Sequence, residues 1–177
     1  LGTLIRLPGT VARFEFWCQD EAMIAEIANQ TASSRVSDQW QREDVRAGIV
    51  HIDTTQSEDY TPQLLNYDIS GVIDFNKGCY TGQEVVARMF YRGKPKKRLY
   101  LLASDNPLNP ESKLLQLHAD DIMPAEVLSI GNSIEGSGEP SLVLAILDTK
   151  AVEGDWNFAL SDHSESFLRI QSLPYPV

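Results

Sequence analysis

The sequence has no apolar run long enough to cross a membrane, since its longest runs, such as residues 142–147, fall far short of roughly 18 residues. No secretory signal segment is visible either. The first residues already have the character of a strand, so we expect an N-terminal portion of the protein to precede them. These absences favour a soluble protein without a membrane partner.

Cysteine and histidine are both scarce. The cysteines, Cys18 and Cys79, form no CxxC or Cys/His ligand spacing. His51, His118 and His163 are scattered, and none has a second ligand at helical or hairpin spacing. We therefore expect no disulfide framework and no metal site, and reduced thiols favour the cytoplasm.

Positive charge is also scarce, with 15 Lys and Arg against 25 Asp and Glu and a formal net charge of -10. Residues 85–98 are the exception, because they contain no acidic residue. This segment holds six of the fifteen cationic side chains: Arg88, Arg92, Lys94, Lys96, Lys97 and Arg98. A concentrated positive stripe on an acidic body favours a local anion site over general affinity for nucleic acid.

The first half of the sequence predicts an α+β layer. Residues 11–17 alternate, with Phe14 and Phe16 on the apolar side and Arg13 on the polar side, as in a half-buried strand. A helix capped by Asp20 should follow. A second helix is predicted over residues 38–47, ended by Gly48. The polar residues 57–62 are expected to form a loop.

After Gly93 the pattern changes to short strands separated by turn residues. Six short strands without an intervening helix predict a small antiparallel β-barrel. The domain boundary is expected at residues 93–96, which divides the chain into a core of residues 1–93 and a barrel of residues 94–177. The six predicted strands cover residues 98–103, 113–117, 126–130, 142–147, 156–160 and 167–171.

The segment around Cys79 carries the strongest chemical signal. Thr81 and Glu84 have the spacing of a capping box and precede an apolar stretch, which predicts a helix that begins at Thr81. Cys79 would then lie just before a helix N-terminus, and Lys77 two residues earlier would add a positive charge. Both stabilise a thiolate. An inert, packed cysteine remains the alternative, because the sequence does not show whether the sulfur is exposed.

Two arginines follow on the same predicted helix. Arg88 lies four residues after Glu84, so a simple surface ion pair explains it. Arg92 has no acidic residue behind it and precedes more uncompensated cations. Recognition of a carboxylate or phosphate by an arginine fork is therefore the second interpretation.

The run Lys77-Gly-Cys-Tyr-Thr-Gly-Gln-Glu84, continued by Val-Val-Ala-Arg88, resembles the signature of the YgfZ family of folate-binding proteins. These are relatives of the glycine-cleavage T-protein. Arg-Ala-Gly-Ile at 46–49, Tyr-Thr-Pro-Gln at 60–63 with Asn66, and Leu-Pro-Tyr at 173–175 also resemble family elements. The chain departs from the family at Val50-His51, where a proline is usual.

The resemblance implies part of a T-protein-like folate-binding α+β core, followed by a C-terminal barrel. It also implies tetrahydrofolate, or a derivative, as cofactor. The implied role is maturation or repair of iron–sulfur proteins, including enzymes that modify tRNA, with these proteins or their assembly machinery as partners and no direct binding of nucleic acid.

The same resemblance implies roles for individual residues. Cys79 would be the functional thiol with Lys77 as its neighbour, and Tyr80, Gln83 and Glu84 would line or support the folate pocket. Arg88 and Arg92 join this set on charge grounds.

Three other functions are compatible with parts of the sequence. The first is a folate-dependent aminomethyltransferase, although the T-protein motif lacks the Lys-Gly-Cys-Tyr element, and whether any turnover occurs stays open. The second is a thiol enzyme with Cys79 as nucleophile, for which no general-base histidine stands out. The third is an RNA-binding module that stacks bases on Phe90, Tyr91 and Tyr100, although helix and strand patterns favour a core role for these aromatics.

Overall fold

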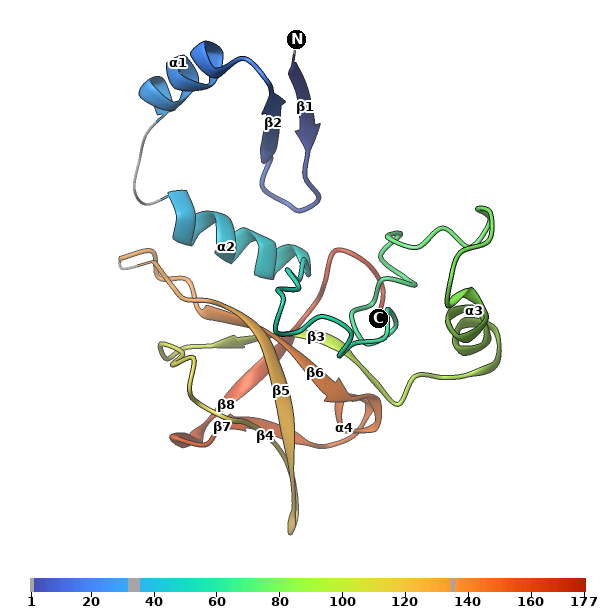
Figure 1. Cartoon of the computed structure of the whole chain (residues 1–177). Coiled ribbons are helices and arrows are strands. Elements are labelled where there is room, and N and C mark those ends of the chain that lie inside the picture. The colour runs from blue at the N-terminus through green and yellow to red at the C-terminus, as the bar shows by residue number, and fades with distance from the viewer. Residues whose placement is uncertain (1, 32–35, 135) are drawn as a thin grey trace.

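The computed structural model describes residues 2–31, 36–134 and 136–177. The chain begins with a hairpin of β1 (Gly2–Arg6) and β2 (Phe14–Cys18), which form a two-stranded antiparallel sheet. Helix α1 (Glu21–Thr31) follows, and Figure 1 shows the hairpin and α1 at the far end of the molecule from the barrel. The Asp20 carboxylate accepts hydrogen bonds from the Ala22 and Met23 amides at 3.1 and 3.2 Å, which confirms the predicted cap.

Helix α2 (Val36–Ala47) lies across the barrel and ends where the sequence predicts (Figure 1). Gly48 has φ of +71°, a left-handed conformation that glycine adopts without a steric penalty. A side chain here would also collide with the C-terminal segment, because a Cβ atom would lie 2.5 Å from the Tyr175 hydroxyl. The helix end therefore serves as a docking point for the end of the chain.

The second half is a closed antiparallel barrel with strand order β3-β6-β5-β4-β7-β8. All six predicted strands are confirmed. The expectation of no intervening helix is wrong, since α4 (Thr149–Glu153) lies between β6 and β7, where the Asp148 carboxylate accepts from the Lys150 amide at 2.9 Å. The strands are β3 (Lys97–Ser104), β4 (Leu114–His118), β5 (Asp121–Gly131), β6 (Ser141–Asp148), β7 (Asn157–Leu160) and β8 (His163–Gln171).

Two apolar cores share the strands β3 and β6. Inside the barrel, Leu102 and Leu147 pack with Phe158 and Leu168. On the outer face, Leu99 and Leu144 pack beneath Val45 of α2 and Leu65 of the following loop. Because successive side chains of a strand point to opposite faces, β3 and β6 contribute to both cores, and their central residues 99–103 and 142–147 are all apolar.

Arg42 fastens α2 to the barrel. Its side chain is 1% exposed, and its guanidinium donates to the carbonyl oxygens of Gly131 at 3.0 Å and Pro140 at 2.7 Å. It also donates to the Glu139 carboxylate at 3.0 Å, and this hydrogen bond, with Arg46 nearby, holds the pKa of Glu139 below its usual value. A Cβ atom on Gly131 would lie 2.8 Å from the Arg42 Cα, so the close approach of α2 requires glycine there.

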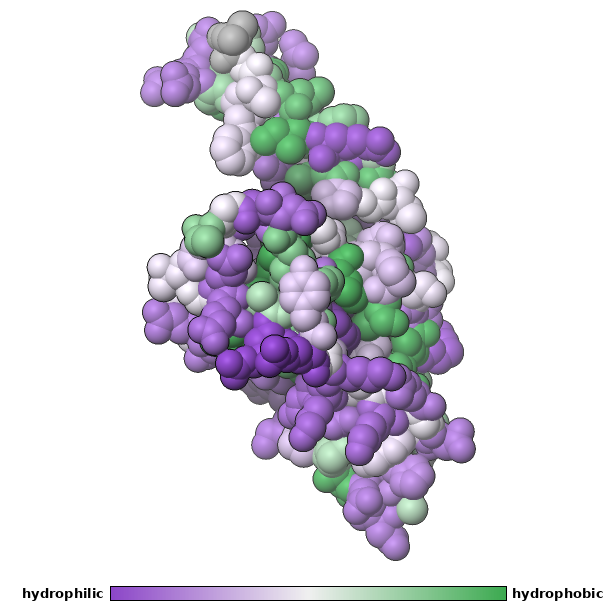
Figure 2. Space-filling model, turned by 90° about the vertical axis from the view of Figure 1, so that its right-hand side faces the viewer, coloured by the Kyte–Doolittle hydropathy of each residue, from purple (hydrophilic) through white to green (hydrophobic). Residues whose placement is uncertain are grey.

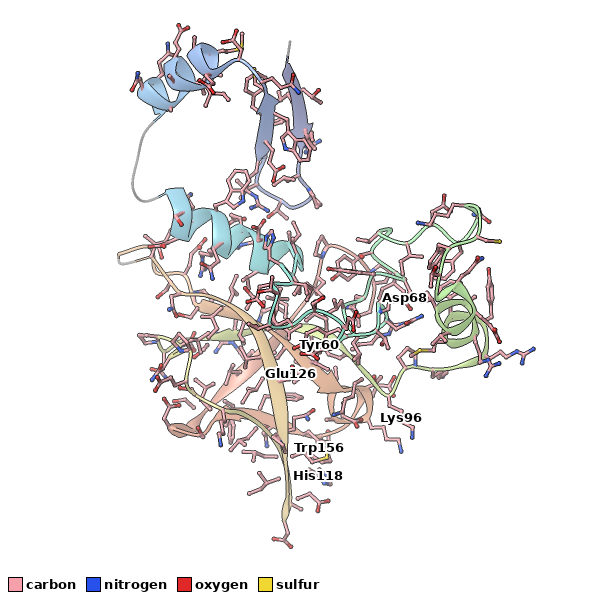
Figure 3. All side chains as sticks on the ribbon, in the orientation of Figure 1. Tyr60, Asp68, Lys96, His118, Glu126 and Trp156 are labelled. Atoms are coloured by element: carbon pink, nitrogen blue, oxygen red, sulfur yellow. The ribbon has the colours of Figure 1, made fainter. Side chains whose placement is uncertain are left out.

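The segment between α2 and α3 (Gln83–Arg92) consists of turns. Its side chains attach it to the barrel. Buried Asn66 donates to the Leu99 carbonyl at 2.7 Å, and Asp68 accepts two hydrogen bonds from Arg98, both at 2.9 Å. Tyr60 donates to the Glu126 carboxylate of β5 (Figure 3). Burial, together with that carboxylate, raises the pKa of Tyr60 to about 12.

Within the described ranges, no helix combines the length and apolar character that crossing a membrane requires. The first barrel strand begins at Lys97, and the division into domains of residues 1–93 and 94–177 stays a prediction.

The buried ion pair between Asp68 and Arg98 should be essential for stability. Asp68→Ala leaves Arg98, whose side chain is 13% exposed, without its carboxylate, and we expect a loss of about 3 kcal/mol in the free energy of unfolding. Urea denaturation followed by circular dichroism measures it.

Asp105→Ala is the matched control, because Asp105 also makes a bidentate pair with an arginine, Arg169, but both side chains are more than half exposed. Its denaturation midpoint should stay close to that of the wild type. Equal effects of the two substitutions would contradict the role given to the buried pair.

Candidate functional site

Helix α3 begins at Gln83, two residues later than the sequence predicts. The predicted capping box is wrong: Gly82 occupies the N-cap position, and no side chain caps the helix. The reason is the backbone of Gly82, whose φ of 86° turns the chain in a left-handed sense immediately before the helix. Thr81 therefore lies outside the helix, and the Gly82 carbonyl accepts from the Val85 amide at 3.2 Å.

Cys79 is exposed and is a free thiol. It lies four residues before the first helical residue, and the field of a helix end weakens quickly beyond its first turn. Exposure is incompatible with the alternative of an inert cysteine packed in the core. The functional role of the thiol stays a prediction.

The ammonium of Lys77 lies 5.0 Å from the centroid of the Tyr80 ring, a cation–π contact. Tyr80 is itself partly open to solvent, so the ring and the ammonium form an exposed pair. Tyr80 follows Cys79 directly in the sequence. The structure thus brings Lys77 to Tyr80, two residues that the sequence assigned to separate roles.

The charged residues predicted on α3 are exposed. Arg88 lies 3.1 Å from the Glu84 carboxylate, and both side chains are largely exposed, which is the surface ion pair that the spacing predicted. Arg92 is exposed in the last turn, where the helix dipole favours a cation. Gln83 is half-buried in the first turn. An arginine fork made of Arg88 and Arg92 stays a prediction.

Aromatic side chains attach α3 to the loop that carries the thiol. Phe75 stacks on Phe90 with ring centroids 4.0 Å apart, and Tyr91 meets Phe90 edge-on at 5.0 Å. Tyr100 is buried in the barrel core, as its strand position indicated. Of the three aromatics considered for stacking RNA bases, Tyr91 is the most exposed, at 71%.

The N-terminal hairpin reverses one expectation from the sequence. Phe14 and Phe16, predicted on the buried side of the strand, are 47% and 38% exposed, while Arg13, predicted on the polar side, is only 7% exposed. Arg13 contacts α2, where its guanidinium lies over the Trp40 ring and 2.7 Å from the Asp44 carboxylate. Figure 2 shows hydrophobic atoms exposed around the hairpin at the top of the molecule.

Two of the histidines, His51 and His118, have defined surroundings. His51 lies 3.0 Å from the second oxygen of Asp44, so Asp44 joins His51 to Arg13. His118 stacks on Trp156 at the far end of the barrel (Figure 3). The side chain of His163 lies outside the described residues. Across the described ranges, no three His, Cys, Asp or Glu side chains come together as a metal site.

A cavity of about 560 Å³, which sequence reasoning missed, lies where the C-terminal end of α3 meets the barrel. The cationic stripe was a partial signal for it, because residues 94–97 form part of its wall. The remaining wall comes from distant segments, which no spacing rule connects. The lining residues are Thr61, Gln63, Leu64, Met89, Gly93, Lys94, Pro95, Lys96, Lys97 and Asp148.

No family model matches the sequence, but comparison with known proteins gives matches that include two YgfZ proteins. The chain is 36% identical over 160 residues to the tRNA-modifying protein YgfZ of Yersinia enterocolitica, covering 89% of this chain and 47% of that protein. It is 34% identical over 150 residues to the tRNA-modifying protein YgfZ of Serratia proteamaculans, covering 83% and 44%. The chain thus spans about half the length of these relatives.

The left-handed turn at Gly82 should control the start of α3. Gly82→Ala forces an L side chain into a conformation that costs about 1–2 kcal/mol, so the first turn of α3 should open more often. Amide hydrogen exchange of residues 83–87 measures this and should become faster.

Gly78→Ala is the control, because Gly78 lacks a left-handed φ and a Cβ atom there would meet no other atom within 4 Å. Exchange in α3 should be unchanged in this variant. Unchanged exchange in Gly82→Ala as well would show that the turn does not determine the helix start.

Proposed function

This chain is a homologue of the tRNA-modifying protein YgfZ over most of its length, and from that premise we propose that it binds tetrahydrofolate or a derivative. We further propose that it supports the maturation or repair of iron–sulfur proteins, including those that modify tRNA. Because the chain spans about half of each relative, these activities are proposed for the intact protein.

The observation that carries this proposal is the exposed thiol within a region of homology. A match that covers 89% of the chain includes its centre, where Cys79 is open to solvent. A thiol that exchanges with a partner protein or a small molecule has to be accessible, whereas a structural cysteine is usually buried. Gly78 and Gly82 flank this region, and a Cβ atom at either position would meet no other atom within 4 Å.

The surroundings of Cys79 support binding of a folate. A folate has a flat aromatic pterin and an anionic glutamate tail, which call for an aromatic surface and cations. Tyr80 with the Lys77 ammonium over its ring offers both within two residues of the thiol. Arg92 is exposed in the last turn of α3, and Arg88 would have to exchange its ion pair with Glu84 for one with the ligand.

We expect Cys79→Ala to abolish support of iron–sulfur enzymes while leaving the fold intact, because an exposed thiol contributes no packing. The measurement is the activity of an iron–sulfur enzyme in cells that lack the wild-type protein and express the variant. Cys18→Ala is the control, since it removes the other thiol, which is partly buried beside the start of α1. Full activity of Cys79→Ala would exclude the proposed role of the thiol.

We expect the intact protein to bind reduced folates in a calorimetric titration, and Tyr80→Ala to weaken that binding by removing the aromatic surface. A protein that gives no heat with any reduced folate would contradict the proposal. Adding an aminomethylated lipoyl carrier separates the two functions: binding without turnover supports an accessory role, and turnover supports a folate-dependent aminomethyltransferase.

A further inference from the structure

Helix α3 exposes an aromatic ring on its outer face. Tyr91 is 71% exposed, and its ring lies edge-on against Phe90, with the ring centroids 5.0 Å apart. Phe90 in turn stacks on Phe75 of the preceding loop, so Tyr91 lies at the edge of a supported aromatic cluster. The core role that the helix pattern favoured is therefore wrong for Tyr91. An exposed ring held by its neighbours offers a flat surface on which another ring can stack.

Four cations follow this ring along the chain. Arg92 is the next residue and is exposed. Lys94, Lys96 and Lys97 then lead into β3, and all three are exposed (Lys96 is labelled in Figure 3). The three lysines border the same hollow where α3 meets the barrel, so they share one surface of the molecule. Figure 2 looks onto the side of the molecule that carries α3, and strongly hydrophilic residues gather there.

No ion pair within the described ranges involves any of these four cations. Glu84 of α3 is paired with Arg88 at 3.1 Å. Asp148, which lies opposite Lys97 in the register of β3 and β6, uses its carboxylate to cap α4. Residues 85–98 contain no acidic residue, although the formal net charge of the chain is -10. The positive charge is thus local and can attract an anionic partner.

The residue types favour a phosphate backbone over an acidic protein surface as that partner. Lysine is depleted where proteins dock on one another, and this surface carries three lysines. Proteins that bind single-stranded nucleic acid combine two features, cations that follow the phosphates and aromatic rings on which bases stack. Both occur here within seven consecutive residues, 91–97. In a duplex the bases stack on one another, so none is available to Tyr91.

We propose that the surface formed by Tyr91, Arg92, Lys94, Lys96 and Lys97 binds single-stranded nucleic acid. A base stacks on Tyr91, and neighbouring phosphates lie along the cations that lead to β3. Contacts to phosphate carry no sequence information, so the site accepts strands of different sequence. The sequence favours the opposite expectation, without nucleic-acid binding, because it does not show that Tyr91 is exposed.

This binding goes beyond the proposed tetrahydrofolate function. Tyr91 and the three lysines are not among the residues proposed for the folate or the thiol. Arg92 belongs to both sets and is therefore left unchanged in the variants below. All binding is measured without folate, so failure of the folate proposal would leave these outcomes unaffected.

The test is fluorescence anisotropy of the intact protein with labelled oligouridylate and oligothymidylate of about 12 nucleotides, a length within the range of single-strand sites. We expect saturable binding of both strands. The logarithm of the affinity should fall with the logarithm of the salt concentration with a slope of about -2 to -3, because roughly four phosphate contacts contribute about 0.7 each. Absence of saturable binding would overturn the site.

Two further probes test the kind of partner. A polyglutamate of equal charge offers no base to stack, and a duplex of equal length offers none that is free, so both should bind more weakly than the single strands. Equal affinity for polyglutamate would overturn the assignment to nucleic acid. Equal or tighter binding of the duplex would overturn the role of stacking.

Two variants separate stacking from charge. Tyr91→Ala should raise the dissociation constant about fivefold or more and leave the salt slope unchanged, because it removes a ring and no charge. The triple variant Lys94→Gln/Lys96→Gln/Lys97→Gln should raise it about tenfold or more and reduce the magnitude of the slope by about 2. Circular dichroism should show the wild-type fold for both variants, because the changed side chains are exposed.

The controls match each variant in type. Trp17→Ala removes another exposed aromatic ring, which is 65% exposed and donates to the Glu15 carboxylate instead of lying beside cations. Lys113→Gln removes an exposed lysine just before β4, which does not border the hollow at α3. Both controls should keep the wild-type dissociation constant. Equal effects of a variant and its control would overturn the assignment of binding to this surface.

Discussion

The pairing of β3 with β6 is the interaction on which the rest of the structure depends. These two strands run antiparallel over eight residues each, from Lys97 opposite Asp148 to Ser104 opposite Ser141. Each is buried on both faces, so one face closes the barrel and the other forms the floor beneath α2 and the loop segment. The hydrophobic effect therefore joins the two halves of the chain through one pair of strands.

This arrangement explains how an exposed loop can be held in place. Asn66 and Asp68 fasten one end of the loop to β3, and Thr149 fastens the connection between α3 and β3 at the other end. Between these anchors, the stacked rings of Phe75 and Phe90 order the loop against α3. Cys79 thus lies in a solvent-exposed segment whose two ends are attached to the barrel by polar contacts.

Buried arginines connect the hairpin to α2 and, in addition to the apolar contacts of Val45, α2 to the barrel. Arg13 and Arg42 are long cationic side chains that are almost fully buried, and each finds carboxylate or carbonyl acceptors on another element. Such contacts depend on geometry more than on composition, because a buried charge is tolerated only where acceptors converge on it. The hairpin consequently leaves Phe14 and Trp17 exposed while its arginine is enclosed.

The sequence alone determined the barrel, the caps at Asp20 and Gly48, and the position of the motif around Cys79, because these depend on alternation, local hydrogen bonding and residue type. Only the tertiary structure decided the burial of Arg13 and the cavity beside Gln63. A two-residue period marks which residues share a face, but not which face meets a partner. Contacts between segments distant in sequence leave no local pattern. Features that depend on such contacts therefore become visible only in the folded structure.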